Sequence, residues 1–279
     1  MTGIYYPELL EVLGAAGVVC AESATTAGWQ TRARSSGGFP APPLGVFWHH
    51  TASDTTPAND LAWMIDGCDD APVGNLLIDR TGTAWPIAAG ASNCAGKGGP
   101  STFSRGTIPA DSGNTRGWQI EVANNGVGET WPQPQVDAFF AASNALNAYV
   151  GNVPGDVITH QAWAPTRKID PATAAAVAGP WHPYAVTSSG TWSVPDIAAE
   201  CARRADTPEV PDMTDDQARQ LDAVYQALVP AVAGFPDPAG GGGNLNPPWA
   251  ALWAEALIAN NVLPLLVDIG NRLAALEAR

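Results

Sequence analysis

Residues 44–50 read LGVFWHH, a short apolar run that ends in two adjacent histidines. A run of this length, preceded by the Gly, Ser and Pro-rich stretch SSGGFPAPP, is typical of a buried β-strand. Side chains alternate between the two faces of a strand, so His49 and His50 point in opposite directions. The stretch therefore predicts a strand whose carboxyl end presents one functional imidazole, because only one of the two histidines can readily face a common site.

A second polar segment, THQAWAPTRKIDP, brings His160, Lys168 and Asp170 into one short stretch of chain. The preceding residues predict a short strand that ends at His160. A catalytic zinc ion takes three N, S or carboxylate ligands from the protein and keeps a fourth position open. Either His49 or His50, together with His160 and Asp170, can supply these ligands. The two segments thus predict a zinc centre.

Helices and strands alternate along the first part of the chain. Helices are expected over residues 7–16, 57–66 and 134–149, and strands over 44–50, 75–85 (a hairpin with its turn at Thr81-Gly82), 117–126 and 157–160. Strands interleaved with helices predict an α/β fold. Three tryptophans in the expected strands, Trp48, Trp85 and Trp118, are assigned to the core.

The composition changes after residue 205. Residues 206–212, DTPEVPD, form a Pro and acid-rich linker, and the leucine spacing after it predicts helices interrupted by the PAGGGGNLNPP hinge. The chain is therefore expected to contain a catalytic domain at 1–205 and a small all-helical module at 213–279. The apolar spacing of this module suits homo-oligomer formation.

The overall composition limits the classes of partner. The 279 residues are 46% hydrophobic and 14% charged, which indicates a globular protein, and the net charge of −14 argues against nucleic acid and anionic membranes as partners. Four scattered cysteines without a CxxC pair are expected to be reduced thiols. We expect no membrane insertion and no signal peptide, because the first apolar residues follow no basic region and no apolar run reaches about 18 residues.

Glu121 is the candidate general base. In the expected strand GWQIEVA, Ile120 and Val122 point to one face while Gln119 and Glu121 point to the other. A solvent-facing glutamate is one interpretation of this pattern, and a carboxylate that takes a proton from an activated water is the other. Lys168 lies two residues before Asp170, so in an extended segment its ammonium can reach the same site and stabilise an oxyanion.

Three motifs together resemble the zinc-dependent N-acetylmuramoyl-L-alanine amidases of the phage-lysozyme and peptidoglycan-recognition type (amidase_2). They are HHTA at a strand end, an IEV strand with its glutamate, and H-x7-K-x-D-P, within roughly residues 40–185. Residues 1–40 resemble the leader of endolysins from actinobacterial phages. The resemblance implies a central mixed β-sheet flanked by helices. It also implies cleavage of the amide between N-acetylmuramic acid and L-alanine in the peptidoglycan of a host cell wall.

The resemblance also assigns roles. It makes His49, His160 and Asp170 the zinc ligands, Glu121 the general base and Lys168 the oxyanion-stabilising residue. An endolysin without a signal peptide is expected in the host cytoplasm until lysis and then at the cell wall. For such a protein the module at 213–279 is expected to serve in wall binding or in homo-oligomer formation.

The sequence departs from the family pattern at two positions. Gly74 stands where a catalytic tyrosine occurs in some members, which leaves Glu121 as the base. Cys94, in SNCAG, stands where a histidine is frequent. A thiolate ligand at Cys94 is disfavoured, because three better-placed ligands are already present.

Three other functions remain open on the sequence. Some proteins of this fold bind peptidoglycan without cutting it, although these usually lack a complete ligand set. A phage structural component with a vestigial α/β domain is a second alternative. The third is a cytosolic recycling amidase acting on soluble anhydro-muropeptides, which would hardly need the module at 213–279.

Overall fold

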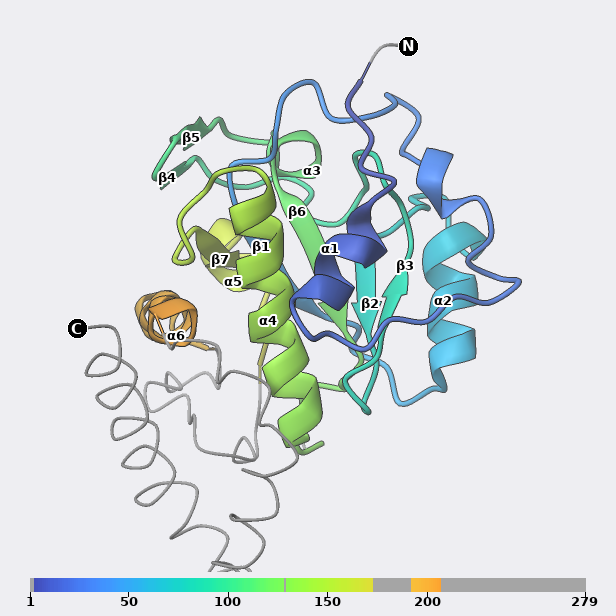
Figure 1. Cartoon of the computed structure of the whole chain (residues 1–279). Helices are drawn as coiled ribbons and strands as arrows, with labels where there is room; N and C mark the ends of the chain where they lie inside the picture. Colours follow the sequence, from blue (N-terminus) through green and yellow to red (C-terminus); the bar gives the residue numbers. More distant parts are fainter. Residues whose placement is uncertain (1–2, 128, 173–191, 207–279) are drawn as a thin grey trace, which may run out of the picture. The chain divides into compact units, whose positions relative to one another are not determined.

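The computed structural model describes residues 3–127, 129–172 and 192–206 (Figure 1). The chain divides into two units, Met1–Thr207 and Pro208–Arg279, and all described residues belong to the first. The predicted helical module at 213–279 lies outside the described residues, so it stays a prediction. The predicted linker at 206–212 begins at the last residue of a helix, since α6 spans Val194–Asp206.

A five-stranded sheet with the order β3-β2-β6-β1-β7 forms the centre of the described unit. Its strands are β1 (Val46–His50), β2 (Leu76–Ile78), β3 (Ala84–Pro86), β6 (Trp118–Val122) and β7 (Val157–Thr159). Strands β2, β6, β1 and β7 run parallel, whereas β3 pairs antiparallel with β2. The predicted α/β fold with a central mixed sheet flanked by helices is confirmed.

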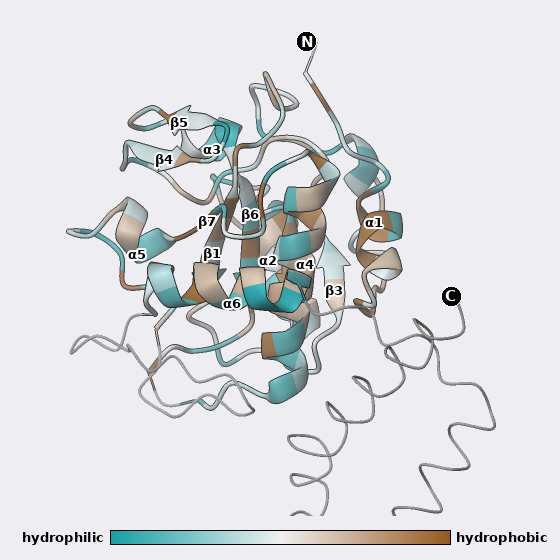
Figure 2. Cartoon of the chain, turned by 60° about the vertical axis from the view of Figure 1, so that its left-hand side comes forward, coloured by the Kyte–Doolittle hydropathy of each residue, from teal (hydrophilic) through white to brown (hydrophobic). Residues whose placement is uncertain are grey.

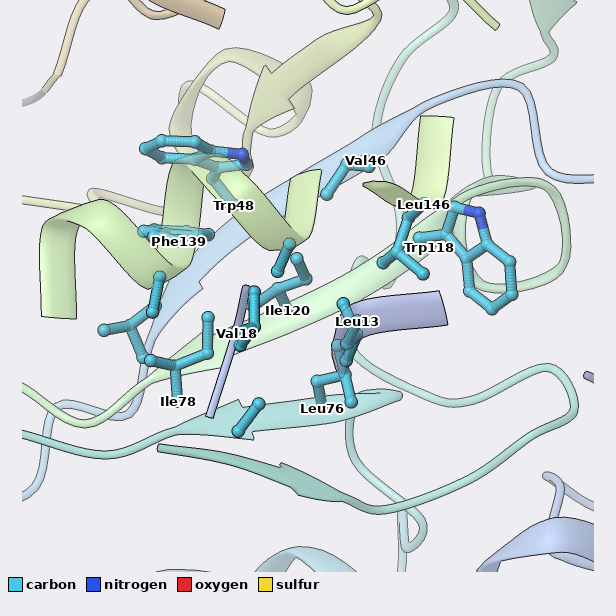
Figure 3. Close-up of a cluster of buried hydrophobic side chains, with 14 of the residues drawn as sticks. Leu13, Val18, Val46, Trp48, Leu76, Ile78, Trp118, Ile120, Phe139 and Leu146 are labelled. Atoms are coloured by element: carbon cyan, nitrogen blue, oxygen red, sulfur yellow. The ribbon is translucent and has the colours of Figure 1, made fainter. Parts of the chain in front are cut away.

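Helices α1 (Leu9–Ala15), α4 (Gln133–Tyr149) and α6 cover one face of this sheet (Figure 1). The layer between them is apolar, and its side chains come from both the strands and the helices (Figure 3). Trp48 stacks on Phe139 with ring centroids 3.5 Å apart, and its indole N–H donates to the Ser143 hydroxyl. Trp48 and Trp118 are fully buried, as predicted, while Trp85 is half-buried.

The opposite face carries α2 (Pro57–Asp66), α3 (Gly113–Arg116), α5 (His160–Trp163) and a hairpin of β4 (Ser101–Phe103) and β5 (Gly106–Ile108). Two separate apolar clusters form here, one around Leu77 and Met64 and one around Phe47 and Trp163. The central strands are coloured as hydrophobic in Figure 2. The site-facing positions of β1 and β6 between the two clusters are nevertheless polar.

Local sequence explains where several elements begin and turn. Thr56 precedes α2, where its hydroxyl accepts the Asn59 N–H at 3.4 Å and Pro57 occupies the first turn. The hairpin turn lies at Thr81-Gly82, as predicted. There Asp79 accepts the Thr81 N–H at 2.8 Å, and Gly82 adopts a φ of 84°. These interactions agree with the sequence pattern at each boundary.

Several features differ from the prediction or were not predicted. His160 does not end strand β7 but opens α5, because the Thr159 hydroxyl accepts the Ala162 N–H at 3.0 Å and caps that helix. The β4–β5 hairpin, the short 3-10 helix η1 (Trp29–Thr31), α3 and α6 had not been expected. Within the described ranges, no helix is long and apolar enough to cross a membrane.

Candidate metal centre and active site

Three of the predicted ligands meet at the carboxyl ends of β1 and β7. The Nδ1 atom of His49 lies 2.8 Å from Nδ1 of His160 and 3.2 Å from Oδ2 of Asp170. The same Asp170 oxygen lies 2.9 Å from Nδ1 of His160. All three side chains are buried. His49 comes from β1, His160 from the first turn of α5 and Asp170 from the loop after that helix, so the structure brings distant segments to one point.

Gln119 determines which nitrogen of His49 faces this point. Its side-chain nitrogen is 3.0 Å from both the Gly113 and the Gly117 carbonyl oxygens, so the amide must present its oxygen to His49. That oxygen lies 2.9 Å from His49 Nε2. The arrangement therefore places a proton on Nε2 and leaves the Nδ1 lone pair directed at His160 and Asp170.

A backbone carbonyl has the same effect on His160. Its Nε2 atom lies 3.0 Å from the Ala95 carbonyl oxygen, which can only accept a hydrogen bond. Arg167 donates to the same carbonyl at 2.8 Å, so this oxygen accepts a second hydrogen bond. His160 therefore also carries its proton on Nε2, and its Nδ1 lone pair faces the centre.

The three converging atoms thus all offer lone pairs to a small volume that excludes solvent. Burial lowers the pKa of His49, but the hydrogen bond with Asp170 and the charge of Glu121 outweigh it, so the pKa of His49 is raised. Burial and the charge of His49 lower the pKa of His160 to about 4. Burial raises the pKa of Asp170, but hydrogen bonds with His160 and His49 hold it well below its usual range. Such a donor set suits a cation.

The second histidine of the pair points elsewhere. The Ala172 N–H lies 3.2 Å from His50 Nδ1, and the His50 ring lies so close to Gly126 that a Cβ there would come within 2.0 Å of it. His50 belongs to neither of the metal-capable groups in the described part of the chain. Strand alternation accordingly places His49, and not His50, among the potential ligands.

Glu121 lies beside the metal-capable group on the neighbouring strand. It pairs in register with His49, so both side chains project from the same face of the sheet. Its side chain is only 8% exposed, which rules out the solvent-facing interpretation. Burial raises the pKa of Glu121, while the charge of His49 acts in the opposite direction. A raised pKa suits a carboxylate that accepts and returns a proton near neutral pH.

A cleft of about 970 Å³ opens onto this group. Glu121, His160, Lys168 and Asp170 all line it, so the structure brings these four predicted residues to one cavity. Lys168 is half-buried, and within the described ranges its ammonium forms no ion pair with a carboxylate. The ammonium is therefore free to meet negative charge in the cleft.

The remaining polar residues of the site had not been predicted. Gln119 could have been found, because it shares the strand face of Glu121 two positions away. The Ala95 carbonyl could not have been found, since a backbone carbonyl carries no side-chain signal. The role of Arg167 could not have been found either, because Arg167 donates to that carbonyl. Cys94 lies next to Glu121, and with His49 these two residues form a second metal-capable group in the described part of the chain. In the group of His49, His160 and Asp170, the three ligand atoms lie 2.8–3.2 Å from one another.

Residues 39–173 match the Amidase_2 family model, described as N-acetylmuramoyl-L-alanine amidase. The match begins just before β1 and ends just after Asp170, so the strands, the cleft and all five predicted site residues fall within the matched segment.

Solved structures of amidases are also similar to the chain. One is the N-acetylmuramoyl-L-alanine amidase LysC from Clostridium intestinale, at 17% identity and a TM-score of 0.36, covering 53% of this chain and 85% of that one. AmpDh3 from Pseudomonas aeruginosa has 18% identity and a TM-score of 0.41 over 82% of this chain and 96% of its own. AmiD from E. coli has 18% identity and a TM-score of 0.39, covering 83% of this chain and 94% of its own. No curated protein sequence matches the chain significantly.

The contact between Gln119 and His49 leads to a first prediction. Gln119→Leu keeps a side chain of similar size but removes the acceptor that holds the His49 proton on Nε2. Loss of such a partner behind a metal-binding histidine costs about 10–100-fold in metal affinity. We expect a decrease of that size in zinc affinity, measured by competition with a chromogenic chelator.

Gln135→Leu is the matched control for this variant. Gln135 is also a buried glutamine, but its side-chain nitrogen donates to the Ala123 carbonyl, and within the described residues it has no histidine partner. An equal loss of zinc affinity in both variants, or none in Gln119→Leu, would contradict the role given to Gln119.

Proposed function

We propose that the protein is a zinc-dependent amidase that cleaves the bond between N-acetylmuramic acid and the L-alanine of the peptidoglycan stem peptide. The observation that carries this proposal is the convergence of His49, His160 and Asp170 beside a cleft that Glu121 and Lys168 also line. The Amidase_2 match over the same residues supports the reaction and the substrate class.

The donor set fits zinc. Two imidazole nitrogens and one carboxylate oxygen form a ligand set of the catalytic type, which keeps one position for water or substrate. Hydrogen bonds to Gln119 and Ala95 hold a proton on each Nε2 atom, so in the neutral imidazoles both Nδ1 atoms offer lone pairs. Without a cation, these two lone pairs and the Asp170 carboxylate would repel one another at 2.8–3.2 Å unless they shared a proton. His49, His160 and Asp170 are therefore the residues that would hold the metal.

The side chains of the cleft divide the remaining chemistry between them. A zinc ion held here would polarise the scissile carbonyl and lower the pKa of a water molecule towards about 7. Glu121 accepts the proton of the attacking water and passes it to the leaving amine of L-alanine. Lys168 stabilises the negative charge that develops on the carbonyl oxygen. Glu121 thus serves as the acid–base group and the Lys168 ammonium as the cation, and both side chains line the cleft.

Digestion of purified cell walls tests this proposal. Mass spectrometry is expected to show glycan with a free lactyl carboxyl group and intact stem peptides that begin with a free L-alanine amine. Removal of zinc with 1,10-phenanthroline should stop the release, and added zinc should restore it. Binding to the walls without release of either product would favour a non-catalytic peptidoglycan-binding protein, and release that survives full zinc removal would contradict the metal dependence.

We further propose that the protein acts as a phage endolysin on the host cell wall. The resemblance of residues 1–40 to endolysin leaders supports this role, and part of that leader belongs to the core, since Leu9, Leu13 and Phe39 are fully buried. A comparison of substrates tests it. An endolysin should hydrolyse intact walls at least as well as soluble anhydro-muropeptides, whereas activity confined to the soluble compounds would indicate a recycling amidase.

A further inference from the structure

The Glu121 carboxylate has an unusual set of contacts for a buried acid. Its Oε1 atom lies 2.9 Å from the Cys94 sulfur, while its Oε2 atom is buried and has no hydrogen-bond partner among the described residues. The thiol is therefore the one hydrogen-bond donor that this carboxylate has within the described part of the chain. Because a buried carboxylate normally holds several such bonds, the single contact has a large influence on its orientation.

The backbone around Cys94 is itself held in place. The Cys94 and Gly96 N–H groups both donate to the side-chain oxygen of Asn114 in α3, at 3.0 and 3.1 Å. Asn93 forms a β-bridge with Val73, and its N–H donates to the Pro72 carbonyl at 2.9 Å. The thiol is thus presented to Glu121 from a segment that hydrogen bonds fix on both sides.

The surroundings of Cys94 and Glu121 determine which of the two groups donates the hydrogen bond. Burial, together with the negative charge of Glu121, raises the pKa of the Cys94 thiol well above its ordinary value. The sulfur keeps its proton and donates it to Oε1. The Oε2 lone pairs are then the ones left to accept a proton in the reaction.

Gly74 approaches Glu121 from another side. It has a φ of 80°, and a Cβ at this position would lie 3.2 Å from the Met64 methyl group and 3.5 Å from Cγ of Glu121. The two positions at which the sequence departs from the family pattern, Gly74 and Cys94, therefore both adjoin the candidate base. Gly74 has no side chain to hold the carboxylate, which leaves that task to Cys94.

We propose that Cys94 is a positioning residue that orients the Glu121 carboxylate for proton transfer through the S–H···Oε1 hydrogen bond. The inference rests on the proposed amidase function, because it concerns the base of that reaction. A thiol that holds one carboxylate oxygen fixes the direction in which the other oxygen accepts the proton. Misplacement of a catalytic group by about 1 Å can cost on the order of 10²-fold in rate.

Two substitutions of Cys94 test the proposal. Cys94→Ala removes the donor and is expected to lower kcat by about 10–100-fold, with KM and zinc content unchanged. Cys94→Ser keeps a hydroxyl donor and should retain most of the wild-type kcat. Cys20→Ala is the matched control, because Cys20 is a half-buried thiol outside the cleft whose sulfur contacts the Leu10 and Val18 carbonyls, and its kcat should stay at the wild-type value.

A double-mutant cycle separates action through Glu121 from a general packing defect. In a Glu121→Gln background, Cys94→Ala should cause no further loss, because the group that the thiol orients is already gone. An independent loss in that background, an unchanged kcat in Cys94→Ala, or no rescue by serine would each overturn the role of Cys94. Absence of muropeptide release by the wild-type protein would instead refute the amidase function itself.

Discussion

Replacement of Glu121 by glutamine is expected to lower kcat for muropeptide release by about 10²–10⁴-fold while the protein keeps its zinc. Glutamine has nearly the same size as glutamate, but a neutral amide cannot take the proton of the attacking water. Zinc content should not change, because Glu121 is not among the three proposed ligands. The rate is measured by release of stem peptides from purified walls, and the metal by elemental analysis of the same sample.

The burial of Glu121 makes this variant easy to interpret. A buried carboxylate with one oxygen that has no partner among the described residues costs free energy in the folded state, so a neutral amide should leave the thermal midpoint unchanged or raise it. Loss of activity then cannot be ascribed to unfolding. Glu11→Gln, at an exposed position of α1, is the control and should behave as the wild type. Wild-type rates in Glu121→Gln would remove Glu121 from the reaction.

Sequence periodicity could predict much of this site because strand geometry is local. Alternation in LGVFWHH separated His49 from His50, and alternation in GWQIEV placed Glu121 opposite the apolar face. The parallel pairing of β1 with β6 then brings His49 and Glu121 into register. The sequence alone did not select between the two histidines as ligands, whereas the family resemblance selected His49. In the structure His49 lies 2.8 Å from His160 and 3.2 Å from Asp170.

The features that could not be predicted depend on the packing of distant segments. The proton positions on the two histidines follow from Gln119 and from the Ala95 carbonyl, and neither contact is visible until the strand order is known. The proximity of Cys94 to Glu121 likewise depends on how the segment between β3 and β4 packs beside β6. Helix α6 was not predicted because one of its three buried residues is a glutamate, Glu200, which apolar spacing does not mark.

Loss of the Asp170 carboxylate is expected to remove both zinc and activity. Asp170→Ala leaves only two imidazoles, and a catalytic zinc centre needs three protein ligands. The metal is worth several kcal/mol of charge stabilisation in the transition state, so its loss corresponds to a rate decrease on the order of 10³-fold or more. Elemental analysis after dialysis should show far less than one zinc per chain, and wall digestion should give no stem peptides above background.

Two further variants show whether this loss is specific. Asp170→Cys supplies a thiolate, which is also a good zinc ligand, and should retain zinc where alanine does not. Asp69→Ala removes an exposed carboxylate from the same cleft and should keep both zinc and activity. If Asp170→Ala still bound one zinc per chain, the ligand set would be wrong, and the group of His49, Cys94 and Glu121 would become the better candidate. In that case Glu121 would hold the metal, so the same measurement also bears on its role as the base.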